Sequence, residues 1–238
     1  MKNFILIALT LACAVAANQA YAKTGVVYEV GSNRKVKLYD YTRKQVPHPG
    51  QNTETHMEGL FKDLSGNVVV TEHLVLIGDN IMSMSSELHQ NGAKYSVALE
   101  AGKLMFSRTE NGKTKLSEET FEAPTISGFQ IEHFVGQNWA KLAAGEEVRF
   151  RYLSLSRGET IPFELLKEDT VAFDGKPSMR VRMQPSNWLF AKFVTPLKFN
   201  FEMEAPHRIM AYVGRTSPLR NDGGKWKDLD AEIIYTEL

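Results

Sequence analysis

Residues 126–145 read ISGFQIEHFVGQNWAKLAAG and decide the predicted fold. Ser127 and Gln130 have the spacing of a capping box at a helix start, and Gly145 is a typical helix stop. Between them, apolar side chains recur at intervals of three and four residues, as on one face of an amphipathic helix. These side chains are Ile131, Phe134, Val135, Trp139 and Leu142. We therefore expect one long helix, although Gly136 in its interior costs about 1 kcal/mol relative to alanine.

The sequence on both sides of this helix has the pattern of β-strands. Turn signals such as Asn91-Gly92 and Asn111-Gly112 recur at short intervals, and apolar and polar residues alternate between them. The predicted strands lie near residues 25–30, 34–43, 53–63, 67–77, 81–89, 94–100, 103–109, 113–121, 146–156, 160–167, 170–174, 177–184, 197–205, 208–215 and 228–237. We predict a mainly β fold, with a strongly curved antiparallel sheet or open β-barrel and the helix packed on its concave face.

The first 22 residues have the layout of a secretory signal peptide. Lys2 precedes an apolar run over residues 4–17, and Ala20-Tyr21-Ala22 has the small residues of a cleavage site. The apolar run is shorter than the roughly 20 residues that a membrane-spanning helix needs. We therefore predict cleavage after Ala22, leaving residues 23–238 as a single β-rich domain.

Cysteine content and charge narrow the class of protein further. The only cysteine, Cys13, lies in the predicted signal peptide, so the mature chain has no disulfide and no cysteine-bound metal. For an exported protein this is typical of the bacterial periplasm, which is the predicted location. The 28 basic residues are balanced by 28 acidic ones, which argues against nucleic acid as a partner because phosphate binding requires surplus positive charge.

Residues with catalytic or metal-binding chemistry are scattered. No nucleophile elbow, phosphate loop, HExxH zinc motif or dinucleotide fingerprint occurs. The pairs His56/Glu58 and Glu72/His73 fit a metal or acid–base site only weakly, and we interpret them as polar residues on solvent-facing strands. A methionine cluster for copper(I) is an alternative, but methionine as an adaptable lining of an apolar interior is favoured. The sequence therefore predicts no catalytic residue, no metal site and no cofactor.

Apolar residues of the later strands and the helix are the predicted ligand site. They are expected to face one another across a shared interior, where burial of apolar ligand surface is favourable. The predicted lining comprises Phe134, Trp139, Phe150, Tyr152, Met179, Val181, Met183, Phe199 and Phe201, with Trp188 and Phe190 at the mouth.

Two stretches resemble the ending strands of exported bacterial families with a half-barrel shape. They are Phe173-Asp174-Gly175-Lys176-Pro177 through Met183-Gln184-Pro185, and Leu197-Lys198-Phe199-Asn200-Phe201. In layout the chain is also similar to the periplasmic lipoprotein carriers, whose half-barrel carries a helix on its hollow side. The resemblance implies a lipid-handling role by analogy of fold alone.

The leading functional expectation is a non-enzymatic periplasmic protein that binds an apolar or amphipathic, lipid-like ligand. Transient contact with a membrane or an envelope protein would accompany that role. The first alternative is a structural or partner-binding protein with a filled core, which acts through an exposed edge strand or a basic band. The band would comprise Arg149, Arg151, Arg180 and Arg182. A hydrolase-type enzyme is the second.

Overall fold

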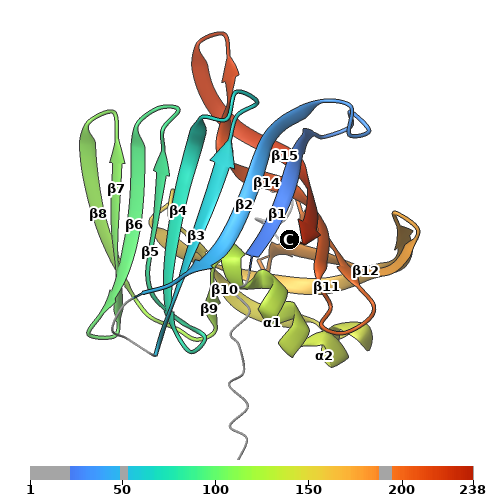
Figure 1. The fold of residues 1–238 in the computed structure, drawn as a ribbon. Helices are drawn as coiled ribbons and strands as arrows, with labels where there is room; N and C mark the ends of the chain where they lie inside the picture. Colours follow the sequence, from blue (N-terminus) through green and yellow to red (C-terminus); the bar gives the residue numbers. More distant parts are fainter. Residues whose placement is uncertain (1–21, 49–52, 188–194, 238) are drawn as a thin grey trace, which may run out of the picture.

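The computed structural model describes residues 22–48, 53–187 and 195–237 (Figure 1). Most of the predicted signal peptide, and the predicted mouth residues Trp188 and Phe190, lie outside these ranges. The strands are β1 (Ala22–Glu29), β2 (Lys37–Val46), β3 (Glu54–Lys62), β4 (Val68–Ile77), β5 (Asn80–Leu88), β6 (Ala93–Glu100), β7 (Lys103–Glu110), β8 (Lys113–Thr120), β9 (Thr125–Ile126), β10 (Val148–Ser154), β11 (Glu159–Phe173), β12 (Lys176–Pro185), β13 (Leu197–Glu202), β14 (Ile209–Asp222) and β15 (Lys225–Glu237). The helical elements are the 3-10 helix η1 (Gly128–Gln130), α1 (Ile131–Gln137) and α2 (Trp139–Ala143).

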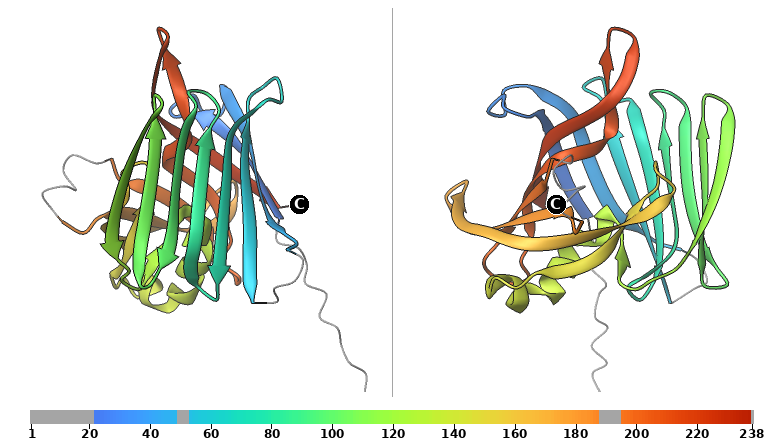
Figure 2. Two further views of the ribbon diagram at one scale, coloured as in Figure 1. Left: turned by 90° about the vertical axis from the view of Figure 1, so that its left-hand side faces the viewer. Right: turned by 180° about the vertical axis from the view of Figure 1, so that it is seen from behind.

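All strands of the described residues belong to one sheet, in the order β8-β7-β6-β5-β4-β3-β2-β1-β15-β14-β13-β12-β11-β10-β9. Pairing is antiparallel except between the short β9 and β10, which are parallel. Because β1 pairs with β15, the first and last strands of the chain lie side by side in the middle of the sheet. The prediction of a mainly β, strongly curved sheet is confirmed (Figures 1 and 2).

The edge strand β8 meets the β10–β11 hairpin through side chains and not through a strand ladder. Ser117 on β8 donates a hydrogen bond to the carbonyl oxygen of Gly158 over 2.7 Å. The backbone N–H of Thr160 on β11 donates to the Glu119 carboxylate over 3.0 Å. The described strands thus form an open, barrel-like sheet whose β8 edge is fastened to the β10–β11 hairpin.

The predicted strands 160–167 and 170–174 are one strand, β11. The register shifts between Lys167 and Asp169, which marks a β-bulge, and the pairing with β12 continues beyond it. A bulge inserts an extra residue and bends a strand without ending it. The prediction of two separate strands here is therefore wrong.

Alternation of residue types along the strands produces the core. On β13, Phe199 and Phe201 are buried, and they lie opposite Val181 and Met179 on β12. The same inward alternation on β2 and β3 places Tyr41 against Phe61, with ring centroids 4.6 Å apart. These inner faces pack together because a strand directs successive side chains to opposite sides of the sheet.

The prediction of one long helix over residues 126–145 is wrong. The predicted capping box of Ser127 and Gln130 is present, but it starts η1, and the helical segment breaks at Asn138. The Asn138 side-chain amide donates to the carbonyl oxygen of Phe134 over 2.9 Å. A side chain that hydrogen-bonds the preceding turn competes with the backbone ladder and bends a helix. The predicted stop at Gly145 is confirmed by its left-handed backbone, with φ of +83°.

The helical segment packs its apolar side into the core from one end of the barrel (Figures 1 and 2). At that end it meets the β4–β5 turn, where the Gln130 side chain donates to the carbonyl oxygen of Asp79 over 2.8 Å. The Trp139 ring on α2 stacks on His207, with centroids 3.7 Å apart. The segment therefore caps the opening of the barrel instead of lying along its concave face.

Among the described residues, no helix combines the length and the apolar character that crossing a membrane requires.

Candidate functional site

A cavity with a volume of about 130 Å³ lies inside the curved sheet. Both halves of the sheet and the helical cap contribute to its wall. The lining comprises Tyr41, Arg43, Phe61, Glu72, Met84, Gly128, Phe129, Ile131, Glu132, Tyr152, Met183, Leu197, Phe199, Ile209, Tyr212, Arg215, Thr216, Ser217, Ile233 and Tyr235. The wall is aromatic for much of its extent, with charged groups among the aromatic rings.

Three of the predicted lining residues face this cavity, and they are Tyr152, Met183 and Phe199. The others among the described residues do not line it. Phe134, Phe150, Met179, Val181 and Phe201 belong to the packed core, and Trp139 lies partly buried beside His207. Phe134 and Phe150 contact each other, with ring centroids 5.3 Å apart. Much of the predicted ligand site is therefore filled by its own side chains.

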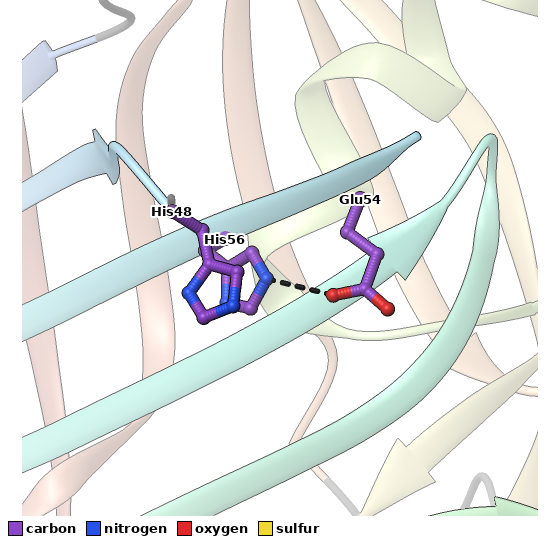
Figure 3. A group of neighbouring side chains, drawn as sticks. All are labelled: His48, Glu54 and His56. Carbon is purple, nitrogen blue, oxygen red and sulfur yellow. Dashed lines mark hydrogen bonds and ion pairs between the residues drawn. The ribbon is translucent and has the colours of Figure 1, made fainter. Parts of the chain in front are cut away.

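The weakly predicted histidine pairs do not form. On β4, Glu72 points into the barrel and His73 outward, where it lies opposite Glu58 on β3. His56 is hydrogen-bonded to Glu54, over 2.9 Å, and not to Glu58 (Figure 3).

The most unusual group in the cavity wall is the carboxyl group of Glu72. Ser217 on β14 donates a hydrogen bond to its Oε1 atom over 2.7 Å. Among residues 22–48, 53–187 and 195–237, no donor is hydrogen-bonded to the other oxygen, Oε2. Burial raises the pKa of Glu72, while Ser217 and the charge of Arg43 oppose that rise. A buried carboxyl group with one unused oxygen is a polar anchor for a ligand.

The position of Glu72 follows from a row of three cross-strand neighbours on the inner face. Arg43 on β2 lies opposite Gly59 on β3, and Gly59 lies opposite Glu72 on β4. Gly59 has no side chain, and the Phe129 ring fills that space: a Cβ on Gly59 would lie 2.9 Å from the Phe129 ring. The glycine therefore lets η1 close over the cavity between the two charged residues.

Tyrosine side chains complete the polar wall. Burial, followed by the nearby charge of Glu72, raises the pKa of Tyr152 to about 12. Burial also raises the pKa of Tyr212 and of Tyr235. These hydroxyl groups therefore stay protonated and serve as neutral hydrogen-bonding groups in the cavity at physiological pH.

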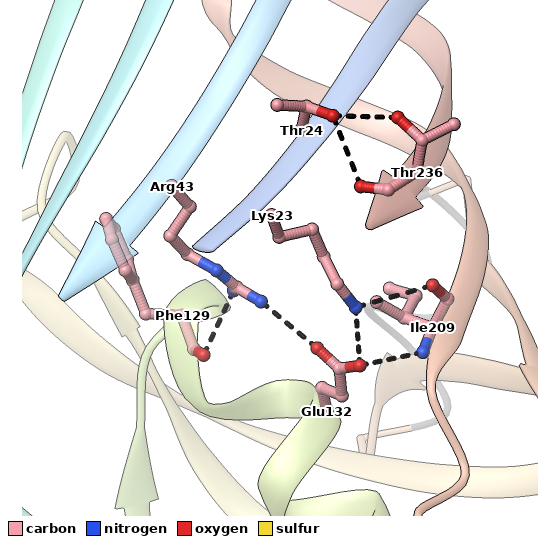
Figure 4. Close-up of polar contacts among 7 residues, drawn as sticks. All are labelled: Lys23, Thr24, Arg43, Phe129, Glu132, Ile209 and Thr236. Carbon is pink, nitrogen blue, oxygen red and sulfur yellow. Dashed lines mark hydrogen bonds and ion pairs between the residues drawn. The ribbon is translucent and has the colours of Figure 1, made fainter. Parts of the chain in front are cut away.

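A buried ion cluster on the helical cap adjoins the cavity (Figure 4). The Glu132 carboxylate on α1 accepts from Lys23 Nζ at 2.5 Å and from Arg43 Nη2 at 3.2 Å. It also accepts the backbone N–H of Ile209 over 3.0 Å. Arg43 donates in addition to the carbonyl oxygen of Phe129 over 3.1 Å. Glu132 thus fastens the cap to β1, β2 and β14 at once.

Arg43 and Lys23 were not predicted from the sequence, and the interpretation of Glu72 as a solvent-facing residue is wrong, although a signal was present. Along β4, the Glu72 side chain points to the same side of the sheet as the buried side chains of Val70 and Leu74. A charged residue at an apolar position of an alternating strand is costly unless it is partnered. Charged residues at the apolar, inward-facing positions of an alternating strand are therefore a better guide to this site than clusters of aromatic residues.

The chain is similar to solved structures but not to a protein-family model or a curated protein. No protein-family model matches the sequence, and no curated protein matches it. One similar solved structure is a β-barrel-like protein of domain of unknown function DUF1849 from Brucella abortus, with a TM-score of 0.42 and 9% identity over 91% of this chain and 96% of that chain. Another is a porin-like protein from Bacteroides uniformis, with a TM-score of 0.22 and 8% identity over the same shares. The resemblance to exported half-barrel families stays a prediction.

Proposed function

We propose that this protein is an exported, non-enzymatic binding protein whose interior cavity holds a small amphipathic molecule. The observation that carries the proposal is the cavity itself, which combines aromatic walls with the buried Glu72 carboxyl group. Apolar cavities with a few convergent polar groups are typical small-molecule sites.

The volume of the cavity limits the size of the ligand. An engineered apolar protein cavity of about 150 Å³ binds benzene, so 130 Å³ fits an aromatic ring or a short chain. A long acyl chain exceeds this volume unless the packed core around Phe150 and Phe201 rearranges. The proposed ligand is therefore a small lipid-like molecule and not one with a long acyl chain.

The polar end of the ligand is proposed to donate a hydrogen bond to Glu72 Oε2. The Ser217 hydroxyl already occupies Oε1, so Oε2 is the carboxyl oxygen left for a donor group of the ligand. Amines and alcohols supply such a donor, whereas a carboxylate brings a second negative charge beside Glu72. We therefore expect amines and alcohols to bind more tightly than carboxylates.

Export and the non-enzymatic role are the sequence-based parts of the proposal. Export rests on the apolar run over residues 4–17 and on the small residues that precede Lys23. The non-enzymatic role rests on the absence of a recognised catalytic motif in the sequence.

A structural or partner-binding role remains the second candidate, because one observation favours it. Five of the predicted lining residues are packed in the core, so the interior is more filled than a carrier of large ligands requires. An exposed residue on the edge strand β8, Leu116, would suit a partner contact.

The cavity can be tested with benzyl alcohol, benzylamine and benzoate as probes, using saturation-transfer NMR. We expect saturable binding of the alcohol and the amine by the wild type. Met84→Trp should abolish it, because Met84 lines the cavity and the larger side chain fills the space. The matched control is Met105→Trp, since Met105 is 36% exposed on β7 and lies outside the cavity. Equal binding by the wild type and Met84→Trp would contradict the proposal.

A further inference from the structure

A second cluster of ligand-type side chains lies on the outer face of the β2–β3 hairpin, away from the cavity. Val46 on β2 pairs with His56 on β3, and His48 follows Val46 by two residues. Glu54 precedes His56 by two residues, so both side chains point to the same side of β3. The hairpin register thus brings together three residues that are not neighbours in sequence (Figure 3).

Three possible donor atoms lie close together in this cluster. One ligand atom from each of His48, Glu54 and His56 lies within 4.8 Å of the others. The imidazole rings of His48 and His56 stack with centroids 4.1 Å apart and an interplanar angle of 15°. His56 Nε2 and Glu54 Oε2 are 2.9 Å apart. Two imidazoles and one carboxylate are a ligand set that zinc and related transition metals accept.

We propose that His48, Glu54 and His56 bind a divalent transition-metal ion of the zinc class. Ligand bonds near 2.0–2.2 Å in a tetrahedral site put donor atoms roughly 3.3–3.5 Å apart. His56 Nε2 and Glu54 Oε2, at 2.9 Å, would need to separate slightly, and the His48 donor would need to approach by up to about 1.4 Å. His48 is exposed and can turn out of its stack on His56. Three protein ligands leave one coordination position for water or for a group from another molecule.

The chain contains a matched control for this inference. Glu87 and His89 repeat the glutamate–x–histidine spacing of Glu54 and His56, with 4.0 Å between His89 Nδ1 and Glu87 Oε1. His89 is hydrogen-bonded to Thr71 over 3.0 Å. Within the described residues no second histidine joins this pair, and His48, Glu54 and His56 form the only group of at least three such ligands. Two donors on an exposed strand bind a metal much more weakly than three.

The test is calorimetric titration of metal-free protein, purified without a histidine tag, with Zn²⁺. We expect one ion per chain in the wild type and in His89→Ala. In His48→Ala, His56→Ala and Glu54→Gln, the affinity should fall by at least the roughly 10–100-fold that even the loss of an outer-sphere partner costs. Circular dichroism of each variant checks that the fold is retained, which we expect because these side chains are not part of the core.

Titration with Co²⁺ gives an independent readout of geometry. A tetrahedral site produces visible absorption bands with Co²⁺, which should appear in the wild type and be absent in His56→Ala. The proposal is overturned if the wild type binds no Zn²⁺, or if folded His48→Ala and His56→Ala retain the full affinity. An equal loss in His89→Ala would also overturn it. None of these outcomes depends on whether the interior cavity binds a ligand.

Discussion

Ser217 on β14 donates a hydrogen bond to Glu72 on β4 over 2.7 Å, although four strands lie between β4 and β14 in the sheet. The contact exists because the sheet curls until its inner faces meet. It joins the two halves of the chain at the cavity wall and holds the carboxyl group that we propose as the ligand anchor.

Glu72→Gln should stabilise the protein and weaken its ligand binding. Glutamine keeps an acceptor for Ser217 but removes a charge whose burial is costly. Because the pKa of Glu72 is raised, the folded state binds more protons than the unfolded state above about pH 4.5. Wild-type stability should therefore fall relative to Glu72→Gln as the pH rises through that range. Urea unfolding between pH 4 and 8 measures the difference, and a difference that does not vary with pH would contradict the prediction.

Glu132→Gln should destabilise the fold by about 3–5 kcal/mol, because it leaves Lys23 and Arg43 buried without their shared counter-charge. The free energy of unfolding in urea measures this loss. The control is Glu118→Gln, which breaks the exposed ion pair with Lys103 and should cost at most about 1 kcal/mol. Similar losses in the two variants would show that the buried cluster does not fasten the cap.

The lowered pKa of Lys23 predicts a second pH dependence of stability, opposite in sign to that of Glu72. Burial lowers the pKa of Lys23 to about 8 from its ordinary value of 10.5, and the pairing with Glu132 only partly offsets this effect. Between these values the unfolded state binds more protons, so the wild type should gain stability relative to Lys23→Met as the pH rises from 8 to 10.5. Thermal unfolding of both proteins across this range is the measurement. A constant difference in melting temperature would count against a buried, charged Lys23.

Two glycines should respond to substitution in opposite directions. Gly59→Val forces the Phe129 ring out of its place and should cost about 1–3 kcal/mol, with loss of probe binding. At Gly136, an added Cβ meets only the carbonyl oxygen of Pro206, at 3.8 Å. Gly136→Ala should therefore stabilise α1 by about 0.5–1 kcal/mol and leave binding unchanged. Differential scanning calorimetry distinguishes the two, and a stabilised Gly59→Val would show that the cap is not tightly seated.

The strand pattern could be predicted because period-two alternation is a local property of the sequence. Phe199 and Phe201 were correctly assigned to an inner face on that basis. The break at Asn138 was not predicted, because a hydrogen bond from its side chain to the preceding turn leaves no trace in the apolar spacing. Nor was the pairing of β1 with β15, which depends on the curvature of the whole sheet.

The cavity was predicted only in part, for a related reason. Aromatic and methionine residues fill space as readily as they line it, so their number does not reveal a hollow interior. Glu72 and Arg43 define the cavity wall more specifically, yet they come from strands far in sequence from Tyr152 and Met183. Their convergence is a tertiary property.

The most direct test of the central claim is native mass spectrometry of the protein isolated from its own host. We predict a fraction with the mass of the mature chain beginning at Lys23 plus one small molecule, which benzylamine displaces from the wild type. Met84→Trp should carry no such addition. A ligand-free wild type that also fails to take up benzylamine or benzyl alcohol would contradict the account.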